Sequence, residues 1–202
     1  MKTLLVTGFE PFGGAQVNPS WECAKAMPDE LPGARVVKAQ LPVAWARVNG
    51  KVNLLLDELR PDAALLLGQA GGRCAITIER IAMNLRESEL ADNLGEIARG
   101  EPVVPGAPDG LFSNLPCRAM LDALNAAGLP AAFSYSAGPY LCNDAMYVAL
   151  HRARTDLPKM RAGFVHVPYM KGQSETAFSM ELEDMIQGIR ICLETLAGRL
   201  EG

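Results

Sequence analysis

The alternation of short apolar segments with longer amphipathic segments constrains the fold of this chain most strongly. Residues 63–67 are apolar throughout, which is typical of a strand buried on both faces. The expected strands cover residues 2–6, 35–41, 63–67, 75–83, 131–135 and 163–167. The expected helices cover residues 18–27, 44–59, 114–127, 139–154 and 174–200. This order predicts an α/β fold, a single-domain three-layer α/β/α sandwich with a mostly parallel mixed sheet.

Length, charge and cysteine content narrow the classes of function. The 202 residues are enough for one domain over residues 1–202. A net charge of −4 without a Lys/Arg cluster argues against nucleic-acid and anionic-membrane partners. The apolar start of the chain is too short for a signal peptide, and no segment is expected to span a bilayer. The five cysteines lack the spacing of a zinc site or a disulfide framework, so we expect no metal and a reducing, cytoplasmic location.

Four of the expected strands end in unusual sequences. These segments are residues 8–14, 68–73, 134–138 and 166–168. Ligands of α/β sheets usually bind beyond the carboxyl ends of the strands, so the four segments predict a site at that edge. Residues 84–112 are rich in glycine, proline and acidic residues, and we expect a long irregular excursion there.

Cys142 lies where segment 136–143 leaves a strand and opens a helix. Pro139 suits the first helical position, which places Cys142 in or near the first turn. The partial positive charge of a helix N-terminus stabilises a thiolate, so we expect a nucleophilic cysteine of low pKa. A buried structural cysteine is the alternative.

His166 is the histidine best placed to act as the base for Cys142. The chain has two histidines, and His151 is expected late in a helix beside Arg152, whereas His166 ends a strand. A Cys–His pair supplies the activated nucleophile that acyl transfer needs. A hydrogen-bonded core histidine is the alternative.

The apolar alternation of the strand at 75–83 slips at Glu79 and Arg80. Such a slip suggests a β-bulge, which often redirects a side chain near a site. Glu79 could accept a hydrogen bond from His166 and fix its tautomer. The alternative is a Glu79–Arg80 pair at a sheet edge.

Phe9 and Phe12 flank a turn that ends in two glycines. Aromatic side chains beside glycine backbone can hold a small planar ring, although aromatic residues also pack in cores. Residues 68–72 follow a buried strand, so their backbone N–H groups could stabilise an oxyanion. This loop lacks the Lys-Ser/Thr pair of a P-loop and the glycine spacing of a dinucleotide site, so we do not expect it to bind phosphate or a dinucleotide.

Taken together, these segments closely resemble the pyroglutamyl-peptidase I (pyrrolidone-carboxylate peptidase) family of cysteine peptidases. The matching blocks are TGFEPFGG at 7–14 with NPS at 18–20, GQAGGR at 68–73 with ITIER at 76–80, SAGPYLCN at 136–143 and GFVHVPY at 163–169. They occur in the family's order and span nearly the whole chain.

The resemblance implies an enzyme that hydrolyses the amide bond after the N-terminal pyroglutamyl residue of peptides, through a cysteine thioester. Family members are cytosolic, need no cofactor and commonly form homotetramers. The resemblance implies a catalytic triad of Glu79, Cys142 and His166. It also implies four substrate-binding residues, namely Phe9, Phe12, Gln69 and Asn18.

The sequence departs from the family at Glu89. Family members typically carry Arg-Ile-Pro-Asp-Asn about ten residues beyond the triad glutamate, whereas residues 89–93 read Glu-Leu-Ala-Asp-Asn here. Loss of the arginine would remove electrostatic support for a thiolate or an oxyanion. Arg86 could take its place, or the chain could be a non-catalytic or substrate-shifted relative that binds a pyroglutamyl-like ligand.

Two other classes of enzyme fit the sequence less well. A glutaminase-type amidotransferase would carry a Gly-x-Cys-x-Gly elbow and a His-x-Glu pair, and neither pattern occurs. A nucleoside phosphorylase would need an anion site with paired cationic residues, which we do not identify in the sequence. Fold class alone does not establish such a function.

Overall fold

A seven-stranded sheet forms the centre of the protein, in a computed structural model that describes residues 1–200. The strand order is β10-β5-β11-β4-β1-β3-β2. The strands are β1 (Lys2–Phe9), β2 (Glu30–Leu31), β3 (Ala34–Leu41), β4 (Ala63–Gln69), β5 (Ile76–Glu79), β10 (Ala131–Ser134) and β11 (Arg161–Val167). The α/β fold predicted from the alternation of segments is confirmed.

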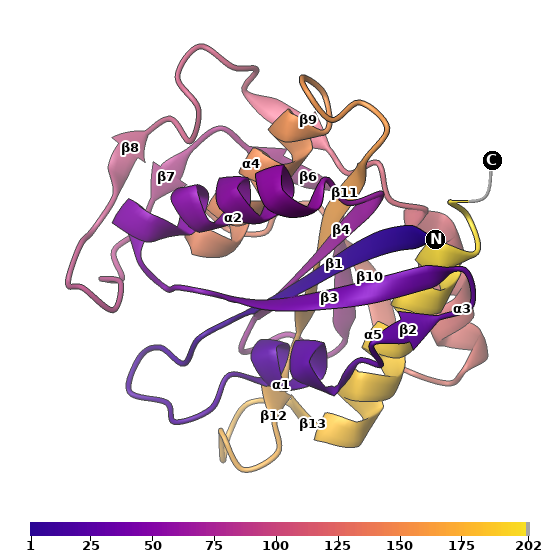
Figure 1. Ribbon diagram of the computed structural model, residues 1–202. Helices are drawn as coiled ribbons and strands as arrows, with labels where there is room; N and C mark the ends of the chain where they lie inside the picture. The colour runs from indigo at the N-terminus through magenta and orange to yellow at the C-terminus, as the bar shows by residue number, and fades with distance from the viewer. Residues whose placement is uncertain (201–202) are drawn as a thin grey trace.

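Five helices cover the two faces of this sheet within residues 1–200. They are α1 (Pro19–Ala26), α2 (Trp45–Leu59), α3 (Cys117–Ala126), α4 (Leu141–Arg152) and α5 (Leu182–Ala197). Helices α1, α3 and α5 pack on one face, and α2 and α4 pack on the other (Figure 1). This arrangement is the predicted three-layer sandwich.

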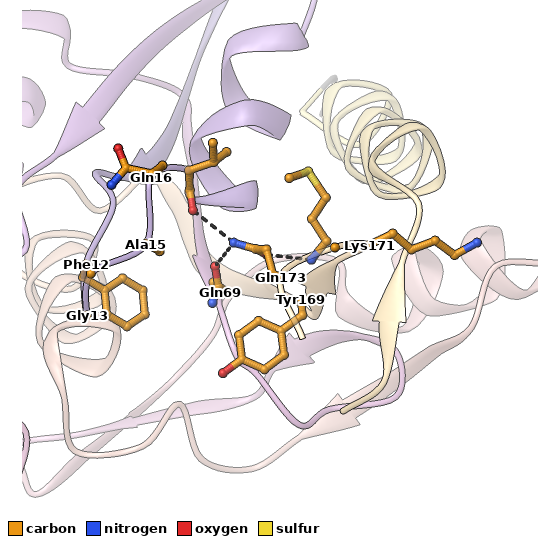
Figure 2. A pocket seen from close by; sticks show the side chains of 12 residues that line it. Phe12, Gly13, Ala15, Gln16, Gln69, Tyr169, Lys171 and Gln173 are labelled. Atoms are coloured by element: carbon orange, nitrogen blue, oxygen red, sulfur yellow. Dashed lines mark hydrogen bonds between the residues drawn. The ribbon is translucent and has the colours of Figure 1, made fainter. Parts of the chain in front are cut away.

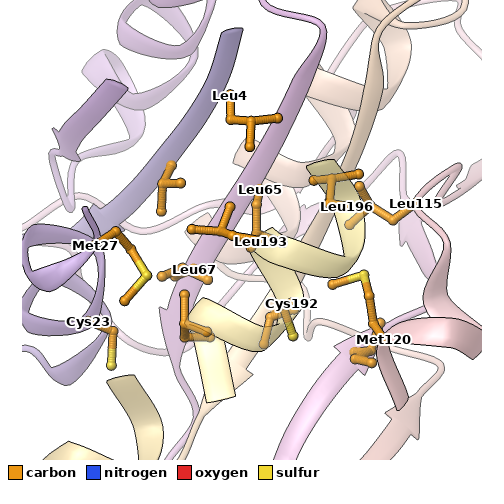
Figure 3. Close-up of a cluster of buried hydrophobic side chains, with 14 of the residues drawn as sticks. Leu4, Cys23, Met27, Leu65, Leu67, Leu115, Met120, Cys192, Leu193 and Leu196 are labelled. Atoms are coloured by element: carbon orange, nitrogen blue, oxygen red, sulfur yellow. The ribbon is translucent and has the colours of Figure 1, made fainter. Parts of the chain in front are cut away.

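Alternate side chains of the central strands fill the two layers of core. In β4, Leu65 and Leu67 point to α1, α3 and α5, where they join Cys23 and Cys192 (Figure 3), whereas Leu66 points to α2 and α4. Because successive residues of a strand face opposite sides of the sheet, a strand covered on both faces must be apolar at every position. The unbroken apolar run in β4 therefore reflects its place near the middle of the sheet.

Strand direction differs from the expected pattern in one respect. Strands β1, β3, β4 and β11 run parallel, but β5 pairs with β11 in the antiparallel direction, and β10 runs parallel to β5. The carboxyl ends of β1, β4 and β11 therefore meet at one end of the strands, and β10 runs in the opposite direction. Segment 134–138 nevertheless reaches the loop after β4, because the Ser136 carbonyl accepts from Arg73 Nη2 at 3.0 Å.

The expected strand at 75–83 is two strands in two different sheets. β5 stops at Glu79, and β6 (Ile81–Met83) pairs with β9 (Gly110–Phe112) outside the central sheet. Arg80 lies between them, and its N–H donates to the Ser134 carbonyl at 2.7 Å. The slip in the apolar alternation marks this change of sheet, and not a bulge within one strand.

All five helices begin later than predicted, by one residue in α1 and α2, two in α4, three in α3 and eight in α5. The last helix starts at Leu182, because residues 174–181 form turns and strand β13 (Ser179–Met180), which pairs with β12 (Tyr169–Met170). Helix α4 starts at Leu141 with Tyr140 as its N-cap, so Pro139 lies before the helix, and Cys142 is the second helical residue. Cys142 thus keeps its predicted place in the first turn.

Residues 84–112 form the expected excursion, with little regular structure. Strands β7 (Arg86–Glu87) and β8 (Arg99–Glu101) form a short ladder beside α2 and α4 (Figure 1). The buried amide of Asn143, the residue after Cys142, holds the start of the excursion through bonds to Met83 and Leu85 carbonyls at 2.8 and 3.1 Å. None of the helices within residues 1–200 is long and apolar enough to cross a membrane.

Candidate active site

His166 and Glu79 lie on adjacent strands and contact each other directly. His166 Nδ1 lies 2.7 Å from Glu79 Oε1, and both side chains are almost completely buried. In the antiparallel register of β11 and β5, His166 is opposite Thr77, so Glu79 is its diagonal neighbour on the same face of the sheet. The sheet itself therefore aligns the pair.

The environment of this pair favours a carboxylate beside a neutral imidazole. Burial raises the pKa of Glu79, but the interaction with His166, a hydrogen bond from Ser134 and the charge of Arg73 together outweigh that effect, so the pKa lies below its usual value. Burial lowers the pKa of His166, although Glu79 opposes the shift. With its Nδ1–H donating to Glu79, the neutral ring leaves Nε2 free to accept a proton.

Cys142, on helix α4, lies close to the same part of the sheet because the strand residue that faces it is a glycine. A Cβ atom on Gly68 would lie 2.8 Å from Cys142 Sγ, so the sulfur packs directly against the backbone of β4. Gly68 is paired in register with His166 on the neighbouring strand β11. The nucleophile and the base predicted from the sequence are thus placed around one position of the sheet.

The thiol of Cys142 does not have the low pKa expected for a helix start. Burial raises its pKa to about 12, and the nearby Glu79 carboxylate adds to the shift. Desolvation disfavours the thiolate by more than the helix terminus stabilises it. Burial therefore favours the neutral forms of both the Cys142 thiol and the His166 imidazole.

Arg73 is a site residue to which sequence reasoning assigned no role. Its Nη1 donates to Glu79 Oε1 and to Thr77 Oγ1, and its Nη2 donates to the Ser136 carbonyl at 3.0 Å. The guanidinium lowers the pKa of Glu79 further and partly offsets the effect of burial on Cys142. The one feature of the sequence that could have indicated a role for Arg73 is its position at the end of the glycine-rich loop after β4.

A small pocket opens beside Cys142, with a volume of about 40 Å³. Its wall is mainly apolar and aromatic, and none of its lining residues is charged. The residues are Phe9, Phe12, Asn18, Val43, Gln69, Tyr140, Leu141 and Cys142. All four residues expected to bind substrate line this pocket.

Asn18 and Gln69 line the pocket in different ways. The side chain of Asn18 caps helix α1 by accepting from Ser20 N–H at 3.0 Å, and its Nδ2 donates to the Glu10 carbonyl at 3.0 Å. Asn18 therefore shapes the wall with its polar atoms already paired. Gln69 accepts at Oε1 from Gln173 at 3.4 Å, while its amide nitrogen points away from Gln173 (Figure 2).

One backbone amide of the loop expected to stabilise an oxyanion is already paired. In loop 68–72, Ala70 N–H already donates to the Val167 carbonyl at 2.9 Å. The N–H groups of Leu141 and Cys142 open helix α4, and neither donates to another residue within residues 1–200. These amides at the helix start are better placed to bind an oxyanion, because they lie beside the sulfur.

Comparisons with known proteins agree with this geometry. The model of the family described as "Pyroglutamyl peptidase" matches residues 2–199. The chain belongs to the pyroglutamyl peptidase family. It is 44% identical to a pyrrolidone-carboxylate peptidase of Thermococcus onnurineus, over 95% of this chain and 97% of the relative, and 43% identical to one of Chromobacterium violaceum, over 96% and 92%.

Solved structures of this family share the whole fold. The pyroglutamyl peptidase I of Bacillus amyloliquefaciens has a TM-score of 0.94 at 35% identity, covering 99% of this chain and 98% of that one. The pyrrolidone carboxyl peptidase of Thermococcus litoralis has a TM-score of 0.95 at 36% identity, with coverage of 100% and 96%. The predicted family and its cysteine-peptidase class are confirmed.

Arg86, considered above as a substitute for the arginine that the resemblance predicts at position 89, bonds to a buried carboxylate. Its Nε donates to Asp144 Oδ1 at 2.9 Å, and its guanidinium lies 5.9 Å from the centre of the Trp45 ring. Arg86 thus neutralises a buried carboxylate. Among the described residues, Arg73 is the cation bonded to Glu79, and Glu89 is exposed on the excursion.

Exchanging Glu89 for arginine is expected to change activity little. An exposed charge is screened by water and salt, so Glu89→Arg should alter kcat/KM on a pyroglutamyl amide by less than about threefold. Steady-state kinetics of the variant and the wild type at two ionic strengths measure the effect. A gain of tenfold or more would instead show that Glu89 limits the rate.

Proposed function

We propose that this chain is an omega-peptidase that removes the N-terminal pyroglutamyl residue from peptides. The observation that carries the proposal is the Glu79–His166 contact, with Cys142 Sγ packed against the neighbouring Gly68. The small uncharged pocket next to the sulfur supports the choice of substrate. The names of the relatives point to the same reaction.

Catalysis begins with a proton transfer from the thiol. His166 Nε2 takes the proton as Cys142 Sγ attacks the pyroglutamyl carbonyl, so charge develops only as the bond forms. Glu79 stabilises the imidazolium that results, and the N–H groups at the start of α4 hold the oxyanion. His166 then protonates the leaving amine, and a water molecule activated by the same imidazole hydrolyses the thioester.

The absence of charged groups from the small pocket accounts for selectivity toward the pyroglutamyl group. A pyroglutamyl group is a neutral lactam ring with one N–H and one carbonyl. Phe9 and Phe12 offer aromatic surface to such a ring, and the wall provides no carboxylate to pair a free α-ammonium. Desolvating an unpaired ammonium is costly, so peptides with an ordinary N-terminus are disfavoured.

We also propose the family's assembly and location for this chain. Residues 1–202 would form a single domain that works without cofactor or metal, as part of a homotetramer in the cytoplasm. All five cysteines are unpaired, which suits a reducing compartment. Light scattering of the purified protein measures the mass of the assembly.

Hydrolysis of paired reporter substrates tests the function. One reporter carries a fluorescent amine linked to pyroglutamate, and the other carries the same amine linked to proline. Proline keeps the five-membered ring but lacks the lactam carbonyl and carries a charged nitrogen. We expect a preference for the pyroglutamyl reporter of about 10⁴-fold, the scale set by unpaired polar groups in a buried site.

Three results would count against this function. A folded protein that is inert on both reporters but binds free pyroglutamate would be the non-catalytic relative. Equal rates on the two reporters would show that the pocket does not distinguish the lactam ring of pyroglutamate from the ring of proline. Release of ammonia from glutamine would point to an amidotransferase.

A further inference from the structure

A second cavity, of about 650 Å³, lies next to the small pocket. Loops 12–17 and 169–173 form its opposite sides, and Gln69 lies between them (Figure 2). Phe12 and Gln69 line both cavities, so these two side chains form the wall that separates them. On the basis of the proposed function, we propose that the large cavity binds the first residues of the leaving peptide.

His166 sets the direction in which the leaving peptide extends. Because His166 protonates the leaving amine, that nitrogen must lie near the end of β11. β11 ends at Val167, and Tyr169 begins the loop that forms one side of the large cavity. A peptide with its ring in the small pocket and its scissile nitrogen at His166 therefore continues past Phe12 and Gln69 into the large cavity.

The cavity is held open by one glutamine. Gln173 Oε1 accepts from Met170 N–H at 2.7 Å, and its Nε2 donates to the Val17 carbonyl at 3.0 Å and to Gln69 Oε1 at 3.4 Å (Figure 2). These bonds join the two loops and the end of β4. A peptide can therefore bind without ordering the walls first, which lowers the entropic cost of binding.

The position of Tyr169 depends on a glycine of the loop after β4. A Cβ atom on Gly71 would lie 2.1 Å from Tyr169 Cζ, so the ring packs directly on the glycine backbone. The same glycine-rich segment that begins with Gly68 at the nucleophile therefore also positions a wall of the large cavity. This shared segment links the two cavities physically.

The groups facing the cavity are neutral donors and acceptors. The amide side chains of Gln16, Gln69 and Gln173 line it. Lys171 is its one charged lining residue, but that side chain extends away from the cavity and pairs with Glu181 (Figure 2). A peptide main chain offers matching amide and carbonyl groups, so the cavity should bind backbone and discriminate little between side chains.

Blocking the cavity while sparing the small pocket tests this inference. Ala15 lines the large cavity and not the small one, so Ala15→Trp adds an indole there without altering Phe12 or Gln69. Ala126→Trp, on an exposed position at the end of α3, is the matched control. The substrates are pyroglutamamide, which releases only ammonia, and a pyroglutamyl tetrapeptide.

We expect Ala15→Trp to lower kcat/KM on the tetrapeptide by about tenfold or more, mainly through KM, and to change it on pyroglutamamide by less than about twofold. Ala126→Trp should leave both values unchanged. Exchanging lysine for glutamate at the third residue of the tetrapeptide should change the wild-type kcat/KM by less than about threefold, because no unpaired charge faces the cavity.

Each outcome separates this inference from the proposed function. If the wild type cleaves both substrates and Ala15→Trp affects them equally, or affects neither, the leaving peptide does not bind in the large cavity. A change of mass in light scattering with equal loss on both substrates would assign the cavity to a contact between subunits. A wild type inert on both substrates would overturn the proposed function itself.

Discussion

Cys142→Ala is expected to abolish hydrolysis of a pyroglutamyl reporter, with a loss in kcat of about 10⁴-fold or more. The reason is chemical, because alanine cannot form the thioester and no described residue of the small pocket offers a second thiol. The fold should survive, because the change removes one sulfur from a half-buried position. Reporter kinetics and thermal unfolding measure the two effects separately.

Cys74→Ala is the matched control for that experiment. Cys74 is also an unpaired cysteine, but it is exposed on the loop before β5. We expect its variant to keep wild-type activity. Brief reaction of the wild type with a pyroglutamyl chloromethyl ketone should add one label, located at Cys142 by mass spectrometry of peptides. Activity in Cys142→Ala, or labelling at another cysteine, would remove Cys142 from the mechanism.

Gly68→Ala is expected to cost about 100-fold or more in kcat/KM, although it changes no group that reacts. The added Cβ would meet Cys142 Sγ and the Phe164 ring, each at 2.8 Å. Either the sulfur or the ring must move, and the Phe164 ring contacts the imidazole of His166, with ring centres 4.7 Å apart. We expect either movement to disturb the geometry between Cys142 and His166.

The control for Gly68→Ala is another glycine-to-alanine exchange. Gly50 lies within helix α2, and a Cβ there meets no atom within 4 Å. Gly50→Ala should retain full activity and raise the free energy of unfolding by up to about 1 kcal/mol, the difference in helix propensity. Wild-type kcat/KM in Gly68→Ala would show that the sulfur does not need its position against β4 for catalysis.

The sequence predicts those parts of the structure that depend on a local pattern of residues. The apolar run at 63–67 predicts β4, because burial on both faces requires apolar residues at every position. Cys142 at a helix start follows from the turn residues before it. Local pattern offered Cys142, His166, Glu79, Phe9 and Phe12 only as candidates with alternatives. The resemblance to a family joined them into one site and added Gln69 and Asn18, because these residues come from distant segments.

Long-range features could not be read from local pattern. The reversed direction of β5 depends on its pairing with β11, and that pairing is what makes Glu79 the diagonal neighbour of His166. The prediction of a low pKa for Cys142 is wrong for a related reason. Burial by distant segments raises the pKa by more than the start of the helix lowers it. Likewise, Arg86 bonds to Asp144, which is 58 residues away, and Arg73 bonds to the Ser136 carbonyl, which is 63 residues away.

The diagonal contact between His166 and Glu79 has a consequence for how the protein acquires activity. The two residues are separated by 87 positions in the chain, and Cys142 lies on a helix between them. Helices and short turns can form early, but none of them brings these residues together; only the pairing of β5 with β11 does. Such non-local pairing forms slowly. During refolding, enzymatic activity should therefore return when the central sheet forms, and later than the helical signal in circular dichroism. Recovery of peptidase activity thus measures the last steps of folding.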